Sequence, residues 1–507
     1  MGMLKSIKLE NYKCFKNATT IDIAPLTVLC GVNSSGKSSI LKSLLMMRQT
    51  VEKESPYNKL SFMGNYVDNG YWEDIINLDS IDDSTATFSL SYKFVLNNYD
   101  PNQNRQDIPA YKEIKKLYGF VSQADTFELE HTITIRKYSP NNTSSPFETY
   151  IGNNNVEKSE INIIVKDKQG TVIPNCTGYV SISKVGNTER DYYLNYKNIP
   201  INNKINSIPQ VNYRCKCYFN NIKLTNIYKQ HINPIVVQAK PTLMSLFNIA
   251  SIQYSGIDFI APLRQYPIRN YIIKGDVSSV GISGEDMPIL LAKNKDDNRN
   301  NDIPIPYKDE KNEYVIDFVL KSSREYTFLQ RVQNWMNYFE LGKLEMDGNY
   351  GLVSLKINNH NIADVGFGVS QILPIIVQGL YMQKDSTLLL EQPEIHLHPK
   401  MQMNMADFLL AVASSERNII VETHSDHIIN RLVRRAMEDN NLRQNMCIYF
   451  IDQNEKYPII EKVIIDKFDG AICDNENFFY QFASETEKII DIGYKNLQSD
   501  QEGNDNE

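Results

Sequence analysis

The chain has 507 residues, of which 42% are hydrophobic and 22% charged, as in a globular protein long enough for roughly two to four domains. Its formal net charge of -8 excludes a surface that is basic throughout, although a local basic patch remains compatible with it. No apolar run reaches the roughly 18 residues of a membrane-spanning helix and no secretory signal is present, so we expect a cytoplasmic protein without a membrane partner.

The cysteines are odd in number, seven, and scattered, which fits a reducing compartment. Cys215 and Cys217 form a C-x-C pair that either belongs to a zinc site or consists of two ordinary strand cysteines. Structural zinc usually takes four ligands and no histidine is nearby, so we favour two strand cysteines.

The first segment with clear periodicity is 4–30, where short alternating runs predict three strands. A glycine-containing loop follows, and a helix is predicted over 37–49. Residues 31–38 read GVNSSGKS and fit the pattern G-x-x-x-x-G-K-[ST]. Strand, loop and helix stand in the order that a phosphate-binding loop requires.

This loop predicts a nucleotide site for physical reasons. Its amides form a nest for anions, and the helix N-terminus adds the positive end of its dipole. Glycines at 31 and 36 let the backbone approach the phosphates. Lys37 reaches the β and γ phosphates, and the Ser38 hydroxyl binds Mg²⁺. The expected nucleotide-binding residues are Asn33, Ser34, Ser35, Gly36, Lys37, Ser38 and Ser39.

The middle of the chain changes character. Alternating runs at 85–95, 126–135 and 161–166 predict antiparallel strands within a β-rich region over 81–255. Further on we expect a polar surface loop at 293–312, a helix at 328–339 and short strands at 344–346 and 352–357. The acidic, Asn-rich end at 496–507 predicts a frayed tail.

A second part of the site is predicted near residue 390. Residues 386–399 read STLLLEQPEIHLHP, in which 387–390 form a buried parallel strand that ends at Glu391. A carboxylate at the end of such a strand is where P-loop enzymes hold the magnesium shell, so Ser38 and Glu391 are the expected metal residues.

A second strand at 418–421 leads into ETHSDH at 422–427. His424, just past the strand end, is placed to contact the γ-phosphate or to polarise a water. Four of the seven histidines lie between 396 and 427, which would also suit zinc. We prefer the nucleotide interpretation, because His396 and His398 precede Pro399 and so shape the turn before a helix at 400–415.

Residues 364–371 read DVGFGVSQ and precede an apolar helix that begins at Ile372. Two glycines and a serine before a helix indicate either another phosphate-binding terminus or a flexible loop before a core helix. The residues by themselves leave both interpretations open.

Taken together, these motifs resemble the ABC-type ATPase heads of the SMC, RecF and OLD group. The resemblance is carried by Asn11, Tyr12 and Phe15 before the phosphate loop, by EQPEIHLHP at 391–399 and by THS at 423–425. More narrowly, the chain resembles a bacterial AAA-type ATPase subfamily with a C-terminal domain of unknown function. The resemblance covers about 1–80 and 256–485.

The resemblance implies an α/β fold, a P-loop ATPase head with a mixed β-sheet flanked by helices, plus a β-rich insertion. It implies ATP and Mg²⁺ as cofactors, with 31–38 as Walker A loop, Glu391 as Walker B acid and His424 as switch histidine. It also implies that two heads dimerise face to face, and that each supplies a signature motif to the other head's ATP. The signature residues would be Gly366, Gly368, Ser370 and Gln371.

One position departs from this group. The catalytic glutamate usually follows the Walker B acid, and here that position holds Gln392. An amide orients water but does not accept its proton, so Glu394 is the nearest replacement. We therefore expect catalysis to involve Glu394, Gln392 and His424. Either hydrolysis is slow, or Glu394 acts as the base. Gln392 also leaves open a different function, that of a nucleotide-gated scaffold with negligible turnover.

We divide the chain into two ATPase halves, 1–80 and 256–427, an insertion, 81–255, an extension, 428–495, and the tail. After His427 we find no acidic cluster of the kind that would indicate a nuclease. The resemblance then implies a sensor or regulator that assembles with itself and with a separately encoded effector protein. It places this role in bacterial anti-phage defence. The alternative is a DNA-repair ATPase. Arg431, Arg434 and Arg435 would suit nucleic acid, or they would form a solvated helix face.

Overall fold

The computed structural model describes most of the chain. The described residues are 2–53, 60–83, 85–97, 109–137, 154–184, 192–202, 204–206, 216–218, 221–223, 234–273, 275–298, 302–318, 326–349, 351–454, 456–475, 477 and 478. The predicted tail at 496–507 and Cys215 lie outside them.

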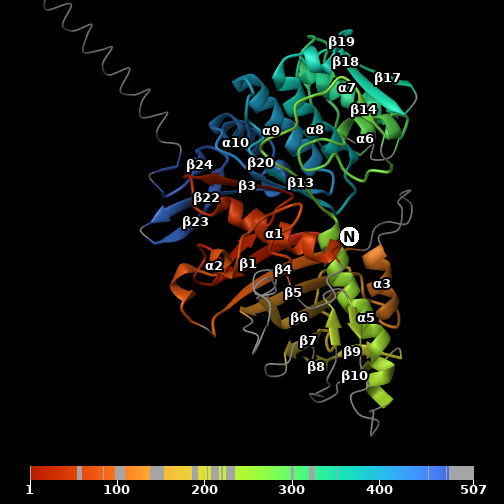
Figure 1. The fold of residues 1–507 in the computed structure, drawn as a ribbon, viewed down its shortest axis with the longest axis vertical. Coiled ribbons are helices and arrows are strands. Elements are labelled where there is room, and N and C mark those ends of the chain that lie inside the picture. Colours follow the sequence, from red (N-terminus) through yellow and green to blue (C-terminus); the bar gives the residue numbers. More distant parts are fainter. Residues whose placement is uncertain are drawn as a thin grey trace, which may run out of the picture.

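A seven-stranded central sheet organises the molecule, in the order β13-β20-β21-β3-β22-β23-β24 (Figure 1). The strands from β13 to β22 are mutually parallel, and β23 and β24 join antiparallel. In sheet order their bounds are Ile257–Ile260, Thr387–Glu391, Asn418–Glu422, Leu26–Gly31, Met446–Asn454, Tyr457–Asp466 and Gly470–Ile472. This mixed sheet confirms the predicted fold class.

The central strands are buried on both faces, and their side chains alternate between two cores. Leu389 packs in the core that contains α1 (Lys37–Glu52), whereas Leu388 and Leu390 pack in the core on the opposite face. This is the period of two that a strand imposes. Parallel strands covered on both sides read as continuous apolar runs, which explains why 387–390 was recognisable.

Helices cover the second face, and a small antiparallel sheet adjoins them (Figure 1). The helices are α6 (Met287–Asn294), α7 (Phe328–Tyr338), α8 (Phe367–Tyr381), α9 (Pro399–Ala413), α10 (Asp426–Glu438) and α11 (Asn440–Gln444). The small sheet contains β14 (Tyr271–Ile272), β17 (Leu344–Asn349), β18 (Leu352–Ile357) and β19 (His360–Asn361). The predicted helices at 328–339 and 400–415 are thereby confirmed.

The first face carries α1 and, beyond it, a second seven-stranded sheet that is antiparallel throughout (Figure 1). Its order is β2 (Thr19–Asp22), β1 (Met3–Glu10), β4 (Thr87–Leu96), β5 (Thr126–Lys137), β6 (Asn154–Lys166), β7 (Gly178–Lys184) and β8 (Tyr192–Lys197). Helices α3 (Pro109–Leu117) and α5 (Pro234–Ser255) pack against one another beside it. The predicted antiparallel strands are confirmed.

The remaining described elements are short. They are α2 (Trp72–Ile75), the 3₁₀ turns Leu78–Ser80 and Ile362–Asp364, and three strand pairs. The pairs are β9 (Ile199–Ile201) with β10 (Lys204–Asn206), β11 (Lys216–Tyr218) with β12 (Asn221–Lys223), and β15 (Tyr307–Lys308) with β16 (Tyr314–Val315).

Strands of one sheet lie on both sides of two domain boundaries that we predicted from the sequence, at 80/81 and 427/428. β1 pairs with β4, so the segment before residue 80 and the region after it share one sheet. β22 pairs in parallel with β3, so a strand assigned to the 428–495 extension lies in the central sheet. Pairing between distant segments has no signature in local periodicity, which is why composition shifts did not locate these boundaries.

The predicted surface loop at 293–312 is wrong in part. Ile303 is fully buried, and Asp302 accepts from the buried guanidinium of Arg417, with 3.1 Å between Asp302 Oδ2 and Arg417 Nη1. Lys384 Nζ lies 2.8 Å from the same carboxylate. The segment is polar in composition, but the carboxylate of Asp302 neutralises the side chains of Arg417 and Lys384, which pack against it.

The arginines of α10 are neither a free basic patch nor a solvated face. Arg431 and Arg435 both donate to the fully buried carboxylate of Asp407, at 2.7 Å each, and Tyr338 donates to it at 2.6 Å. Of the three predicted arginines, Arg434 alone has a side chain more than half exposed, at 53%. The sequence pattern of α10 could not predict this arrangement, because Asp407 belongs to another helix, α9.

Candidate functional site

The loop between β3 and α1 has the backbone conformation that its glycines were expected to provide. Gly31 has φ 130°, and an added Cβ would lie 2.0 Å from the Ile451 carbonyl oxygen. Gly36, the N-cap of α1, has φ 103°, and a Cβ there would lie 2.5 Å from Cys14 Sγ. Gly31 therefore requires glycine both sterically, because the clash is with backbone, and conformationally, whereas the main requirement at Gly36 is its positive φ.

Lys37 begins α1 and folds back over the loop. Its Nζ donates to the carbonyl oxygens of Gly31, at 3.1 Å, and Val32, at 2.5 Å. Burial lowers the pKa of this ammonium, while the charge of Glu422 counteracts the shift. The cation is thus held against the same loop whose amides and helix dipole favour an anion.

The Ser38 hydroxyl donates to Glu422 Oε1 at 3.1 Å. Glu422 is the last residue of β21, which lies between β20 and β3, and its side chain is buried with Oε2 lacking a partner among the described residues. Sequence reasoning did not select Glu422 as a site residue. Its signal was available: a carboxylate ends an apolar strand there, as Glu391 does at 387–391.

Glu391 and Glu422 are register partners at the ends of β20 and β21. Burial and the neighbouring Glu422 raise the pKa of Glu391 to about 7. Burial also raises the pKa of Glu422, against the opposing effects of Ser38 and Lys37. Two like charges at one sheet edge, with a serine hydroxyl beside them, form a set of hard oxygen ligands that suits Mg²⁺.

The turn after β20 carries the predicted catalytic residues. Gln392 has φ 43°, and its backbone N–H donates to the Glu422 carbonyl oxygen at 2.8 Å. The Glu394 side chain crosses to the β21 end, where Oε1 accepts from the His424 backbone N–H at 2.7 Å. Burial raises the pKa of Glu394, and this N–H is the largest opposing influence.

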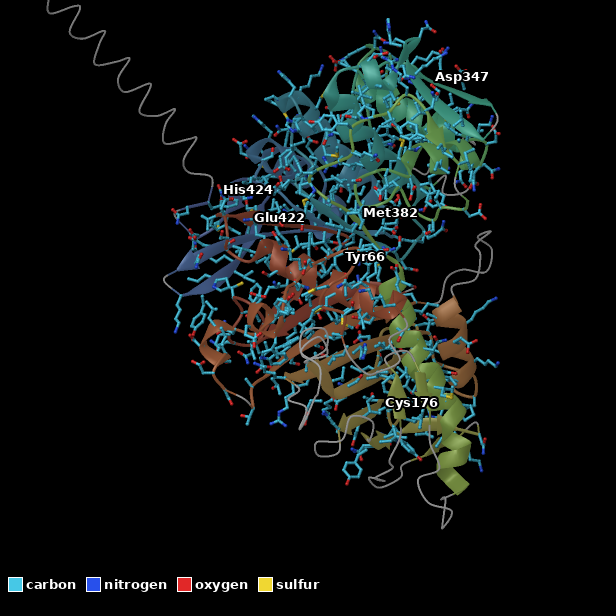
Figure 2. The ribbon with its side chains drawn as sticks, in the orientation of Figure 1. Tyr66, Cys176, Asp347, Met382, Glu422 and His424 are labelled. Atoms are coloured by element: carbon cyan, nitrogen blue, oxygen red, sulfur yellow. The ribbon has the colours of Figure 1, made fainter. Side chains whose placement is uncertain are left out.

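His424 lies near Glu422 at the same end of β21 (Figure 2). Its side chain is exposed, and its pKa is lowered by burial of part of the ring and by Lys37. His396 and His398 lie in the predicted turn: His396 has φ 63°, and His398 caps α9 by accepting from the Lys400 N–H. Among the residues that the structure describes, no three His, Cys, Asp or Glu side chains cluster in a way that would hold zinc.

Arg264 is a further residue of this site. It follows β13, the strand beside β20, and its Nη2 donates to the Glu391 carbonyl oxygen at 3.3 Å. The residue is 4% exposed. Burial lowers its pKa to about 10, although the Glu394 charge opposes the shift. Sequence reasoning did not select Arg264 as a site residue.

The predicted signature segment begins α8, with Gly366 as its N-cap. No atom would lie within 4 Å of a Cβ added at Gly366, and at Gly368 the nearest is the His396 carbonyl oxygen at 4.0 Å. Ser370 and Gln371 are buried, at 5% and 1% exposure. The segment therefore presents its glycines outward, whereas its serine and glutamine face the protein.

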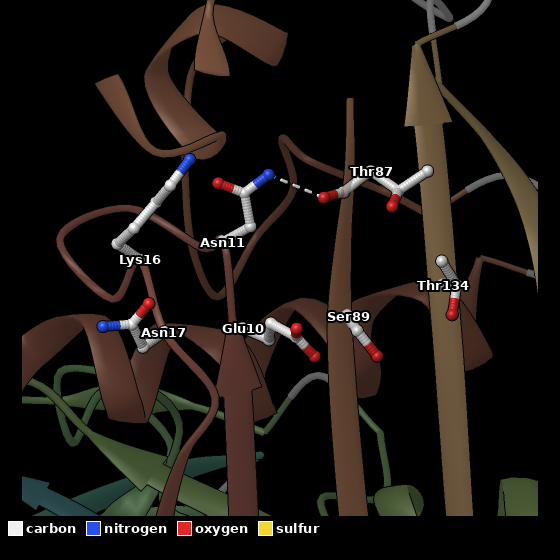
Figure 3. A pocket seen from close by; sticks show the side chains of 7 residues that line it. All are labelled: Glu10, Asn11, Lys16, Asn17, Thr87, Ser89 and Thr134. Carbon is white, nitrogen blue, oxygen red and sulfur yellow. Dashed lines mark hydrogen bonds between the residues drawn. The ribbon is translucent and has the colours of Figure 1, made fainter. Parts of the chain in front are cut away.

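A polar pocket of about 460 Å³ lies elsewhere, on the outer face of the antiparallel sheet (Figure 3). Two of its side chains are bound within the protein itself. Asn11 Nδ2 donates to the Thr87 carbonyl oxygen at 2.7 Å, and Lys16 Nζ donates to Ser80 Oγ at 2.5 Å. We assign this pocket no chemistry.

Residues 3–429 match the family described as the AAA ATPase domain. No curated protein matches the chain. Among solved structures, an SMC head bound to the C-winged helix domain of ScpA is similar at 12% identity and TM-score 0.40, over 92% of this chain and 98% of that chain.

Two further solved structures are similar. The SMC head domain of Thermotoga maritima gives 10% identity and TM-score 0.33, over 91% of this chain and 100% of that chain. An SMC head with an extended coiled coil, bound to the C-terminal domain of ScpA from Pyrococcus furiosus, gives 12% identity and TM-score 0.37, over 91% of this chain and 96% of that chain. In the described part of this chain, no helix is both long and apolar enough to cross a membrane.

Proposed function

Because this chain belongs to the AAA ATPase domain family, we propose that it binds ATP with Mg²⁺ at the carboxyl edge of its central sheet and hydrolyses it slowly. The observation that carries the proposal is the hydrogen bond from Ser38 to Glu422, which joins the phosphate loop to the end of a strand 384 positions away. Parallel strands end at one edge, so Glu391 lies at this edge too.

The nucleotide's phosphates would lie on the loop of residues 31–38, against its amides and the start of α1. Lys37 would exchange its contacts with the loop carbonyls for β- and γ-phosphate oxygens. Ser38, Glu422 and Glu391 would hold Mg²⁺, directly or through water. The metal would supply charge neutralisation between the β- and γ-phosphates.

Glu394 is the residue we assign as general base. Gln392 cannot accept a proton, whereas Glu394 keeps one carboxylate oxygen, Oε2, without a partner in the described structure. Gln392 would orient the water or the phosphate through its amide. The exposed imidazole of His424, near Lys37, would contact the γ-phosphate as a neutral donor.

We also propose that ATP links two copies of the chain, with the start of α8 in one copy facing the γ-phosphate of the other. The open surroundings of Gly366 and Gly368 support this arrangement. Because Ser370 and Gln371 are buried, the contact would come from the backbone amides of the first turn of α8. The partner we propose is a separately encoded effector in anti-phage defence, a proposal supported by the resemblance of the motifs.

Phosphate release tests the enzymatic part. We expect ATP turnover that needs Mg²⁺, is abolished in Lys37→Ala and falls about 100-fold or more in Glu394→Gln. Tight ATP binding without any turnover in the unaltered protein would favour the nucleotide-gated scaffold instead.

Light scattering tests the assembly. With ATP, the mass of Glu394→Gln should double, because slow hydrolysis preserves the linking nucleotide, and the mass of Lys37→Ala should remain that of one chain. A copurifying effector that is lost from Lys37→Ala would support the regulatory role. A single-chain mass with and without ATP would contradict the dimer.

A further inference from the structure

Arg264 is turned toward the candidate site, unlike its neighbours. Leu263 and Tyr266, in the same loop, are 75% and 73% exposed, whereas Arg264 is 4% exposed. One of its nitrogens, Nη2, donates to the backbone carbonyl of Glu391. The loop therefore places the guanidinium of Arg264 at the end of β20, where we expect the phosphates to bind.

The guanidinium has hydrogen-bonding capacity to spare. Within the described residues, Nε and Nη1 of Arg264 have no partner, although both atoms are buried. Glu394 follows Glu391 by three residues, and its Oε2 is also buried and without a hydrogen-bond partner in the described structure. Its charge interacts with that of Arg264. Buried polar atoms are rarely left without a hydrogen-bond partner, and an unsatisfied charged group is the most costly case.

Arg264 thus has unsatisfied donors and Glu394 an unsatisfied acceptor, and one small polar group could satisfy both. A water molecule has the required hydrogen-bonding capacity, because its oxygen accepts a hydrogen bond from Arg264 while it donates one to Oε2 of Glu394. The orientation that this imposes is the one that general-base catalysis needs.

We propose that Arg264 is a positioning residue for ATP hydrolysis, which holds the attacking water against Oε2 of Glu394. The inference rests on the proposed function. The water oxygen bonds to the γ-phosphorus as its proton passes to Glu394, and the bond from the γ-phosphorus to the bridging oxygen breaks, which releases ADP. The proton then leaves Glu394 for solvent or phosphate.

The charge of Arg264 supports this role. Burial alone would favour the protonated form of Glu394, which is inactive as a base, and Arg264 is one of the groups that lower the pKa of Glu394 again. The backbone N–H of His424 and the Thr423 side chain act in the same direction.

Steady-state phosphate release in five variants tests the proposal. For Arg264→Gln we expect kcat to fall about 100-fold while KM changes less than about threefold, because the residue acts on the chemical step. Arg264→Lys keeps the positive charge but loses the planar set of N–H donors of the guanidinium. Its kcat should therefore lie about tenfold below that of the unaltered protein. The double variant Arg264→Gln with Glu394→Gln should be no slower than Glu394→Gln, within about threefold, because both residues hold one water.

Arg434→Gln is the control, since it removes an exposed arginine outside the site and should leave kcat and KM unchanged. Binding of a fluorescent ATP analogue and a thermal melt establish that each variant folds. If Arg264→Gln does not fold, Arg264→Lys decides. Unaltered kcat in the Arg264 variants, a rise in KM alone, or additive losses in the double variant would each overturn the positioning role. Absence of turnover in the unaltered protein would instead contradict the proposed function itself.

Discussion

Ser38, at the start of α1, donates to Glu422, at the end of β21, across 3.1 Å and 384 positions of sequence. Glu391, the acid that the strand pattern selected, lies one strand further out as the register partner of Glu422. The phosphate loop therefore meets the nearer of two carboxylates, and a cation at this edge would be shared between them.

Glu422→Gln tests which carboxylate meets the metal first. We expect the apparent Mg²⁺ requirement for turnover to rise at least about tenfold, because an amide replaces a charged ligand next to Ser38. ATP binding in EDTA should be unchanged. Magnesium titrations of phosphate release, with Glu391→Gln in parallel, measure this effect. An unaltered magnesium requirement would remove Glu422 from the metal shell.

Gly31→Ala tests the packing of the phosphate loop. The new Cβ would meet the Ile451 carbonyl at 2.0 Å, with φ at 130°, so we expect a loss of stability of more than about 3 kcal/mol and loss of ATP binding. Gly351→Ala is the matched control. It also has a positive φ, 78°, but its Cβ meets nothing within 4 Å, so about 1 kcal/mol is expected. Urea denaturation measures both, and equal losses would contradict the steric argument.

His131 predicts a pH dependence of stability. It is fully buried on β5, where its ring nitrogens contact Tyr254 Oη at 2.9 Å and Ser159 Oγ at 3.0 Å, and burial lowers its pKa to about 3. The unfolded chain, with a histidine pKa near 6.5, binds this proton more readily, so stability falls as pH drops below about 6.5 and continues to fall toward pH 3. At pH 5 the loss is roughly 2 kcal/mol.

His131→Gln should remove that part of the pH dependence, because an amide does not titrate. Urea denaturation at pH 7 and pH 5 measures it, and the difference between the two pH values should be smaller in the variant by roughly 2 kcal/mol. Equal differences in both proteins would show that the folded state accommodates a charged ring at this position.

Arg435→Gln tests the role of α10. It leaves the buried Asp407 with less compensation, so we expect a loss of about 3–5 kcal/mol without a change in DNA retention at low salt. Arg434→Gln, on the exposed side of the same helix, should cost less than about 0.5 kcal/mol. Gel shifts at two salt concentrations and urea denaturation separate the two effects. A weaker gel shift in a folded Arg435→Gln would revive the DNA-binding alternative.

The sequence by itself determined the local parts of this protein. The apolar runs at 26–30, 387–390 and 418–421 specified strands, of which 387–390 was predicted to be buried and parallel. Residues 31–38 specified a loop with glycines at 31 and 36, and both glycines have a positive φ. These signals depend on neighbours along the chain, so a single sequence carries them.

The tertiary structure decided which distant groups meet. Strand order placed Glu422 rather than Glu391 beside Ser38, brought Arg264 to the Glu391 carbonyl oxygen, and enclosed Asp407 with Arg431 and Arg435. It also inserted β22 next to β3 and joined β1 to β4. Such pairings depend on sheet order and on burial, which bring together residues hundreds of positions apart and leave no trace in the local pattern of either segment.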